Sequence, residues 1–117
     1  MDKTHPEYYR QLMELGGKLG AELKSPMGAF ARLHSSAVAE GTLTTKTKEL
    51  ISLGIAVCVR CNGCISCHVH DALRAGASRE EILETLGVAI LMGGGPSMVY
   101  ACEALEAVDE FEAEGLE

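Results

Sequence analysis

The chain has little aromatic and little basic character. It contains no Trp, two Phe and three Tyr among 117 residues, so its core must be built mainly from Leu, Ile, Val, Ala and Met, which suits closely packed helices. Ten Lys and Arg stand against seventeen Asp and Glu, a net charge of −7. This charge repels phosphate backbones and anionic lipid surfaces, so we expect neither nucleic acid nor a membrane as a partner.

Long apolar runs are also missing. The first six residues lack the apolar core of a signal peptide, and no run approaches the roughly 20 residues that cross a bilayer. We therefore expect a cytoplasmic protein. In that reducing compartment a cysteine cluster is more often catalytic or metal-binding than a structural crosslink, and the chain has five cysteines, an odd number.

Length and periodicity predict a single domain over residues 1–117, all-α, with about six helices and no sheet. A chain this short struggles to cover the apolar faces at 50–59 and 82–92, so a homo-oligomer is expected. The expected helices are 8–23, one starting at Ser25-Pro26 and ended by Gly41, 44–60, one from the cysteine cluster to Ala75, one capped by Ser78 and running through Met92, and about 97–111.

Two glycine features stand out in this pattern. Gly54 and Gly87 lie in apolar helices, where we expect another backbone to approach closely. The run from Gly93 to Gly95 follows a helix and has no Lys-Ser/Thr after it, so we interpret it as a tight interhelical connection and not a phosphate loop.

One ten-residue stretch, 61–70, concentrates the chemistry, with three of the five cysteines and two of the four histidines. If it is helical, Cys61, Cys64 and His68 fall within an arc of about 60°. Cys67 and His70 point away from that face. A helix N-terminus stabilises a thiolate, and a histidine one turn further on can move a proton, so the spacing favours a redox dithiol.

Three other interpretations of the stretch remain open. Cys64-Ile65-Ser66-Cys67-His68 matches the c-type haem motif, although no export signal accompanies it. Three cysteines and a histidine could form a metal centre, but Asp71 occupies the next ligand position of an iron–sulfur run. The cysteines could also be small buried residues without a function. Cys58 and Cys102, with apolar or small neighbours, fit that last description.

The remaining candidates carry weaker signals. Glu49 lies near the start of a helix, where acidic residues are common for electrostatic reasons, and taken alone it reads as a solvated charge. His5 and His34 have no partner in the sequence and read as surface or groove residues.

A wider pattern resembles a known family. Glu49, Cys61-x-x-Cys64-x-x-x-His68 and the segment from Ala72 to Ile82 are similar to the signature of the carboxymuconolactone decarboxylase and AhpD-like alkylhydroperoxidase family. The resemblance covers nearly the whole chain, through Met92-Gly93-Gly94-Gly95-Pro96 to the last helix. It implies an all-helical, AhpD-like fold that assembles as trimers or hexamers.

The resemblance also implies an activity. AhpD-like members reduce hydroperoxides with a CxxC dithiol, a Glu and a His that relays protons, here Cys61, Cys64, Glu49 and His68, with Cys67 as a candidate auxiliary thiol. We expect no cofactor and no metal, a hydroperoxide substrate, and an external dithiol or protein reductant. Two alternatives are a lactone decarboxylase or isomerase, whose family members typically lack the cysteine pair, and a non-enzymatic redox sensor.

Overall fold

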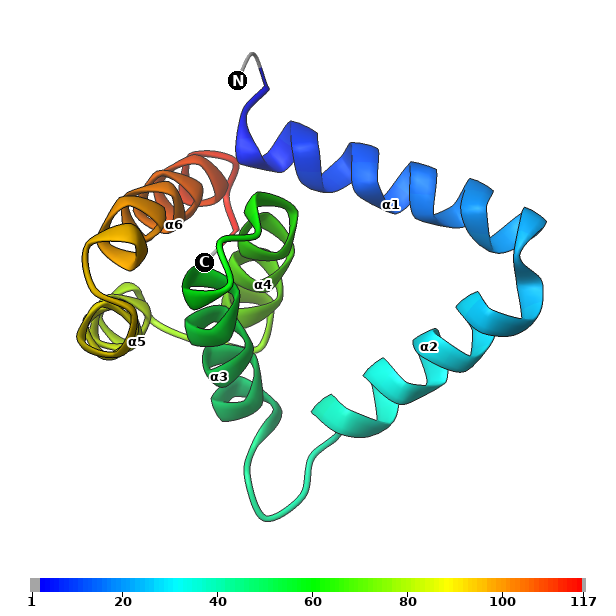
Figure 1. Ribbon diagram of the computed structural model, residues 1–117, viewed down its shortest axis with the longest axis horizontal. Helices are drawn as coiled ribbons and strands as arrows, with labels where there is room; N and C mark the ends of the chain where they lie inside the picture. Colours follow the sequence, from blue (N-terminus) through cyan, green and yellow to red (C-terminus); the bar gives the residue numbers. More distant parts are fainter. Residues whose placement is uncertain (1–2, 117) are drawn as a thin grey trace.

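The computed structural model describes residues 3–116, and its regular structure is entirely helical (Figure 1). Within this range the expectation of about six helices without a sheet is confirmed. No helix in residues 3–116 combines the length and apolarity needed to cross a membrane. The helices are α1 (His5–Glu22), α2 (Lys24–Val38), α3 (Thr45–Cys58), α4 (Asn62–Arg74), α5 (Arg79–Gly93) and α6 (Gly95–Ala113).

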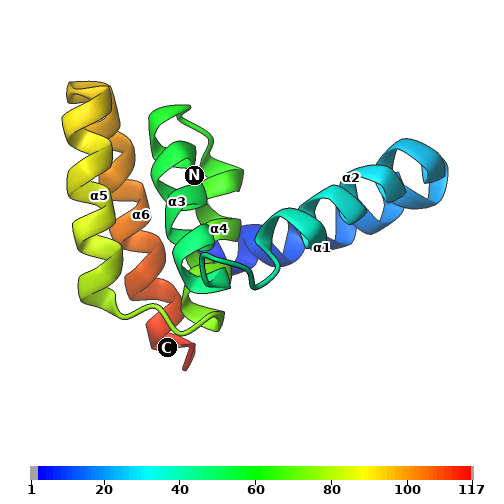
Figure 2. The same ribbon diagram turned by 90° about the horizontal axis from the view of Figure 1, so that it is seen from below.

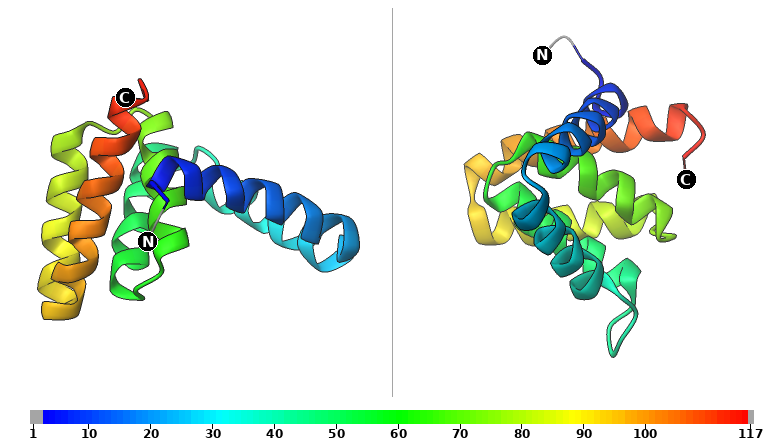
Figure 3. Two further views of the ribbon diagram at one scale, coloured as in Figure 1. Left: turned by 90° about the horizontal axis from the view of Figure 1, so that it is seen from above. Right: turned by 90° about the vertical axis from the view of Figure 1, so that its right-hand side faces the viewer.

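Helices α3 to α6 pack together, and α1 and α2 project from them as an arm (Figures 2 and 3). The core between α3, α4, α5 and α6 is aliphatic, as the composition predicts. Leu53, Ile65, Val69 and Ile82 are completely buried. Burial of each such side chain stabilises the fold by about 1.5–3 kcal/mol. Leu53 belongs to α3, and Ile65 and Val69 belong to α4, so their burial holds these two helices together and positions the cysteine cluster.

The arm carries apolar residues that this chain does not cover. No residue of α2 is buried, and only His5 and Pro6 are buried in α1. Phe30 is 65% exposed and Leu33 is 62% exposed. The apolar face of α5 is uncovered as well, with Leu91 at 79%. Contiguous exposed apolar faces often mark protein–protein contacts.

Several helix ends agree with the sequence prediction. Thr44 caps α3 by accepting a hydrogen bond from the Thr47 amide, and Ser78 forms the expected capping box with Glu81. Gly76 takes a φ of 95° directly after α4, a left-handed conformation that glycine adopts without a side-chain clash.

Other helix ends differ from the prediction. Ser25 does not cap α2, because the chain enters that helix at Leu23 without a side-chain cap. Gly41 lies beyond the end of α2, which stops at Val38. Helix α1 begins earlier than predicted, because Thr4 forms a capping box with Glu7. Helix α6 likewise begins two residues early, at Gly95.

The glycine prediction was wrong in its positions. A Cβ at Gly54 would make only ordinary contact with Thr85, and a Cβ at Gly87 would meet nothing within 4 Å. The close approach occurs instead at Gly93, where a Cβ would overlap the Ser97 hydroxyl and lie 2.7 Å from the Ser97 Cβ. Gly94 follows with a φ of 73°, which makes the sharp connection between α5 and α6.

Gly93→Ala should therefore destabilise the protein by about 1–3 kcal/mol, because the buried Ser97 side chain cannot withdraw without moving α6. Gly87→Ala is the matched control in the same helix and should stabilise by up to about 1 kcal/mol. Urea unfolding of both variants measures the difference. Equal stability of the two variants would contradict the packing described for Gly93.

Candidate active site

The two cysteines of the CxxC sequence form a disulfide at the start of α4. Their Cα atoms lie 5.2 Å apart. Cys61 is the N-cap residue, and the Cys64 amide donates a hydrogen bond to the Cys61 sulfur over 3.2 Å. Arg60, just before it, has a φ of 60°, an uncommon value for a residue with a side chain, and turns the chain sharply from α3 into α4. The helix start predicted at the CxxC is confirmed.

A buried acid and a histidine meet between α3 and α4. The Glu49 carboxylate oxygen lies 3.0 Å from Nδ1 of His68, and Glu49 is only 3% exposed. A buried carboxylate needs a partner, because leaving it unpaired costs several kcal/mol. An ionised carboxylate only accepts hydrogen bonds, so a contact with ionised Glu49 uses Nδ1–H of His68. In residues 3–116, Nε2 of His68 makes no hydrogen bond. Glu49 is therefore not the solvated charge that its position alone suggests.

Cys64 and His68 lie one turn apart on α4, on the same face of the helix. Cys64 also packs against the core, whereas Cys61 stands at the helix entrance. In residues 3–116 no hydrogen bond links the disulfide sulfurs to Glu49 or His68. The structure thus joins Glu49 to His68 directly, and Cys64 stands one helical turn before His68 on α4.

Two further groups surround this pair. Ligand atoms of His34, Glu49 and Asp71 all lie within 4.8 Å of one another, which brings the exposed His34 of α2 to the site. The expectation that His34 lies at the surface is confirmed. Asp71 contacts His70 Nδ1 over 2.8 Å, and the Tyr9 ring stacks on His70. Asp71 was missed from the sequence, although its position one turn after His68 could have indicated it.

Cys67 lies in a different environment from the pair. Burial, and secondarily the negative charge of Asp71, raise the pKa of the Cys67 thiol to about 11. At neutral pH this thiol is almost entirely protonated, and the thiolate is the reactive form. The environment of Cys67 therefore disfavours a part for it in rapid thiol chemistry.

The structure corrects two assignments outside this site. Cys102 is exposed rather than buried, while Cys58 is half-buried with its thiol donating to the Ala89 carbonyl. His5 is buried, at 2% exposure, because its ring Nδ1 is hydrogen-bonded to Ser66 Oγ and its Nε2 faces Glu103 and Glu106. Sequence reasoning missed that environment, since these partners lie at least 61 residues away.

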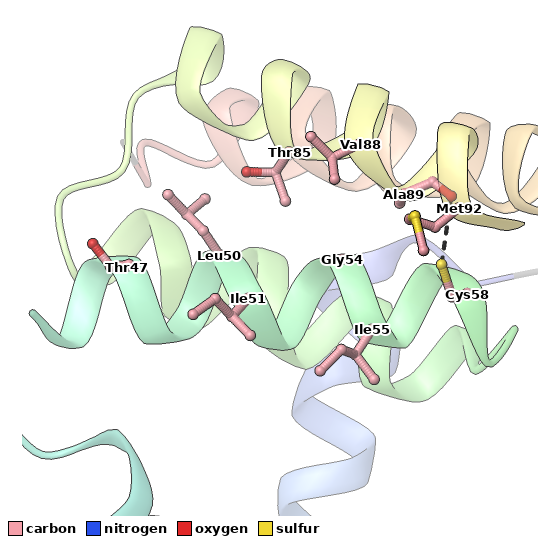
Figure 4. Close-up of a pocket in the computed structure, with 10 residues that line it drawn as sticks. All are labelled: Thr47, Leu50, Ile51, Gly54, Ile55, Cys58, Thr85, Val88, Ala89 and Met92. Atoms are coloured by element: carbon pink, nitrogen blue, oxygen red, sulfur yellow. Dashed lines mark hydrogen bonds between the residues drawn. The ribbon is translucent and has the colours of Figure 1, made fainter. Parts of the chain in front are cut away.

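An apolar groove of about 560 Å³ runs between α3 and α5 (Figure 4). Leu50, Gly54 and Ile55 line it from α3, and Val88 and Met92 line it from α5. Glu49 lies on the opposite side of α3, so this groove does not open onto the cysteine pair. Its uncovered apolar lining belongs to the faces that a partner subunit was expected to cover.

The comparisons with known proteins agree with this fold. Residues 26–107 match the model of the carboxymuconolactone decarboxylase family. A carboxymuconolactone decarboxylase family protein of Legionella pneumophila has a similar structure, with a TM-score of 0.88 and 43% identity over 92% of this chain and 96% of that one. An uncharacterized protein of Cupriavidus necator is 39% identical over 97 residues, covering 83% of this chain and 86% of its own.

Two other similar proteins have descriptions that mention function. A family member of Thermotoga maritima, for which an antioxidative role has been suggested, has a TM-score of 0.75 and 31% identity over 92% of this chain and 97% of its own. The alkyl hydroperoxide reductase AhpD of Nocardia farcinica is 39% identical over 59 residues, which are 50% of this chain and 33% of that protein. The chain therefore belongs to the carboxymuconolactone decarboxylase family, with AhpD-like proteins among its relatives.

Proposed function

We propose that this protein is a thiol peroxidase that reduces hydroperoxides with the Cys61–Cys64 dithiol. The observation that carries the proposal is a disulfide-forming CxxC at a helix N-terminus, one turn away from a histidine that a buried glutamate holds. The reduced cysteine pair donates two electrons, and the histidine and glutamate transfer protons. The antioxidative role suggested for the Thermotoga relative and the AhpD likeness agree with this chemistry.

The reaction begins with the reduced dithiol. The Cys64 thiolate attacks the terminal oxygen of the hydroperoxide, the O–O bond breaks, and the alcohol leaves with a proton. Cys64 is then a sulfenic acid. The Cys61 thiol attacks that sulfur, the disulfide forms and water leaves, so the two thiols have lost two electrons and the peroxide has gained them. An external dithiol or a protein reductant restores the two thiols by exchange.

His68 and Glu49 act as the proton relay in this scheme. With Nδ1–H held by Glu49, the free Nε2 of His68 can accept the thiol proton of Cys64 and return it to the leaving alcohol. The imidazolium that forms in between is stabilised by the buried carboxylate. Glu49 is thus a positioning residue and His68 the proton carrier.

The structure offers each cysteine a different advantage. The Cys61 sulfur accepts a hydrogen bond from the Cys64 amide at the helix start, and this bond stabilises negative charge on the sulfur. Cys64 has the histidine one turn away. We assign the attack on peroxide to Cys64, because peroxide cleavage needs a proton donor, and the resolving role to Cys61, which an external dithiol reaches more easily at the helix entrance.

The family name also admits a lactone decarboxylase, but no described feature favours that reaction over redox chemistry. Thiol alkylation separates the two. A lactone enzyme keeps its activity after all cysteines are blocked, whereas a peroxidase loses it. A redox sensor differs again, because its thiols are oxidised once by peroxide and it shows no catalytic turnover when a reductant is added.

Replacing each cysteine tests the assignment. With one equivalent of peroxide, reduced Cys64→Ser protein should remain unoxidised, because it lacks the attacking thiol. Cys61→Ser protein should consume about one equivalent and stop at the sulfenic acid, since the raised pKa of Cys67 makes that thiol a poor substitute resolver. Intact-mass spectrometry detects the added oxygen.

The opposite pattern, with Cys61→Ser inert and Cys64→Ser gaining one oxygen, would reverse the roles. Wild-type reactivity of both variants would show that peroxide does not react at this cysteine pair. Cys102→Ser, which changes an exposed thiol, is the control and should behave as the wild type.

Glu49→Gln tests the relay while keeping the shape of the side chain. The rate of peroxide reduction at neutral pH should fall by roughly one to three orders of magnitude, because the carboxylate no longer stabilises the imidazolium. Glu84→Gln, which removes the same charge from the exposed face of α5, is the matched control. Stopped-flow measurement of a wild-type rate in Glu49→Gln would rule out the relay.

We also propose that the protein works as a homo-oligomer, a trimer or hexamer. The arm, α3 and α5 expose apolar faces that include Phe30, Ile55 and Leu91, and a second copy of equal shape can cover them. Light scattering at micromolar concentration should give the mass of three or six chains. A monomer under those conditions would contradict this assembly.

A further inference from the structure

A second polar cluster lies away from the cysteine pair, where α1 begins against α4 and α6. His5 is buried, and its Nε2 lies 3.5 Å from a Glu103 carboxylate oxygen and 3.8 Å from one of Glu106. The ligand atoms of all three residues lie within 4.8 Å of one another. We propose that His5, Glu103 and Glu106 bind a divalent transition metal ion, with zinc as the ion that best suits these ligands.

The orientation of His5 supports this proposal. Its Nδ1 is hydrogen-bonded to Ser66 Oγ, and Ser66 is completely buried on α4. A metal at Nε2 requires the tautomer with Nδ1–H, and histidine ligands normally donate that proton to a fixed acceptor. Ser66 supplies such an acceptor and holds the ring so that Nε2 points at the two carboxylates.

Nε2 of His5 is not otherwise satisfied. A separation of 3.5 Å from Glu103 exceeds the 2.7–3.2 Å of a normal N–H···O hydrogen bond, and no other polar atom of residues 3–116 is hydrogen-bonded to Nε2. Ligands around a tetrahedral zinc are separated by about 3.4 Å, since each bond measures about 2.0–2.2 Å. The observed separations need only a small adjustment of the exposed Glu side chains to reach this value.

The local charge also favours a cation. Glu103 and Glu106 follow each other at one helical turn on α6, and in the described part of the chain neither is paired with a lysine or arginine. Glu110, one turn later, accepts a hydrogen bond from the His5 amide over 2.7 Å. Three carboxylates thus surround the start of α1. One imidazole with two carboxylates suits zinc and its transition-metal neighbours better than magnesium or calcium, which prefer oxygen ligands alone.

A metal bound here would join α1 to α6 directly, and α4 through the hydrogen bond between His5 and Ser66, since His5 begins α1, Ser66 belongs to α4 and both glutamates belong to α6. It would anchor the base of the arm to the helix that carries the cysteine pair. The proposal does not depend on peroxidase activity, and metal binding tests it separately.

The test is calorimetric titration of the oxidised protein with zinc chloride after chelator treatment. Wild-type protein should bind one zinc per chain with a dissociation constant below about 100 µM. Glu103→Gln/Glu106→Gln should weaken binding by roughly 100-fold or more, because it removes two of the three ligands, whose side chains are 42% and 61% exposed. Ser66→Ala should weaken it by about 10-fold to 100-fold, since it frees the ring.

Glu84→Gln is the matched charge control and should bind zinc as the wild type does. The free thiols are the same in every variant, so zinc held by a thiol appears equally in all titrations. Zinc should also raise the thermal midpoint of the wild type but not of the double variant, because a ligand stabilises only the folded state that binds it.

The proposal is overturned if wild-type protein binds no zinc at millimolar concentration, or if the double variant binds as tightly as the wild type. A third outcome would also overturn the proposal: His34→Ala loses the one high-affinity zinc, and the double variant keeps it. The metal would then lie at His34, Glu49 and Asp71 instead.

Discussion

The contact between Glu49 and His68 organises the candidate active site. It joins α3 to α4 at the point where a carboxylate is almost entirely removed from water. Because burial of an unpaired carboxylate is costly, the pairing fixes which face of α4 turns toward α3. Cys64 shares that face of α4, so this pairing, together with the aliphatic core, holds the thiol in place relative to α3.

Around that pair the fold separates two kinds of surface. The chemistry lies at the N-terminal end of α4, where the amides of the first turn and the disulfide meet. The apolar groove lies on the other side of α3, and further exposed apolar residues, such as Phe30 and Leu33, lie on α2 of the arm. A subunit contact on the groove would therefore leave the cysteines open to a substrate and a reductant.

Local signals in the sequence predict the fold well. The Ser78 capping box and the Thr44 cap come from short-range hydrogen bonds, so they are readable from a few neighbouring residues. Long-range burial is not readable in this way. His5 is buried by Ser66 and by α6, and the residues next to His5 in the sequence do not indicate these partners.

The candidate site shows the same contrast between local sequence signals and long-range packing. Spacing alone places Cys61, Cys64 and His68 on one helix face, whereas the burial of Glu49 depends on how α3 packs on α4, and only the family resemblance indicated its part. The same spacing sets Cys67 apart from that face but does not indicate its pKa. Its raised pKa comes from burial and from Asp71, which are properties of the folded chain.

The central claim is that Glu49 holds His68 in the tautomer that presents Nε2 to Cys64. The most direct test is the imidazole nitrogen spectrum of the reduced protein, recorded by NMR for the wild type and for Glu49→Gln. We predict a proton on Nδ1 of His68 in the wild type and a changed His68 tautomer balance in the variant, with the signals of His70, which contacts Asp71 instead, unchanged. Identical His68 signals in both proteins would contradict the account.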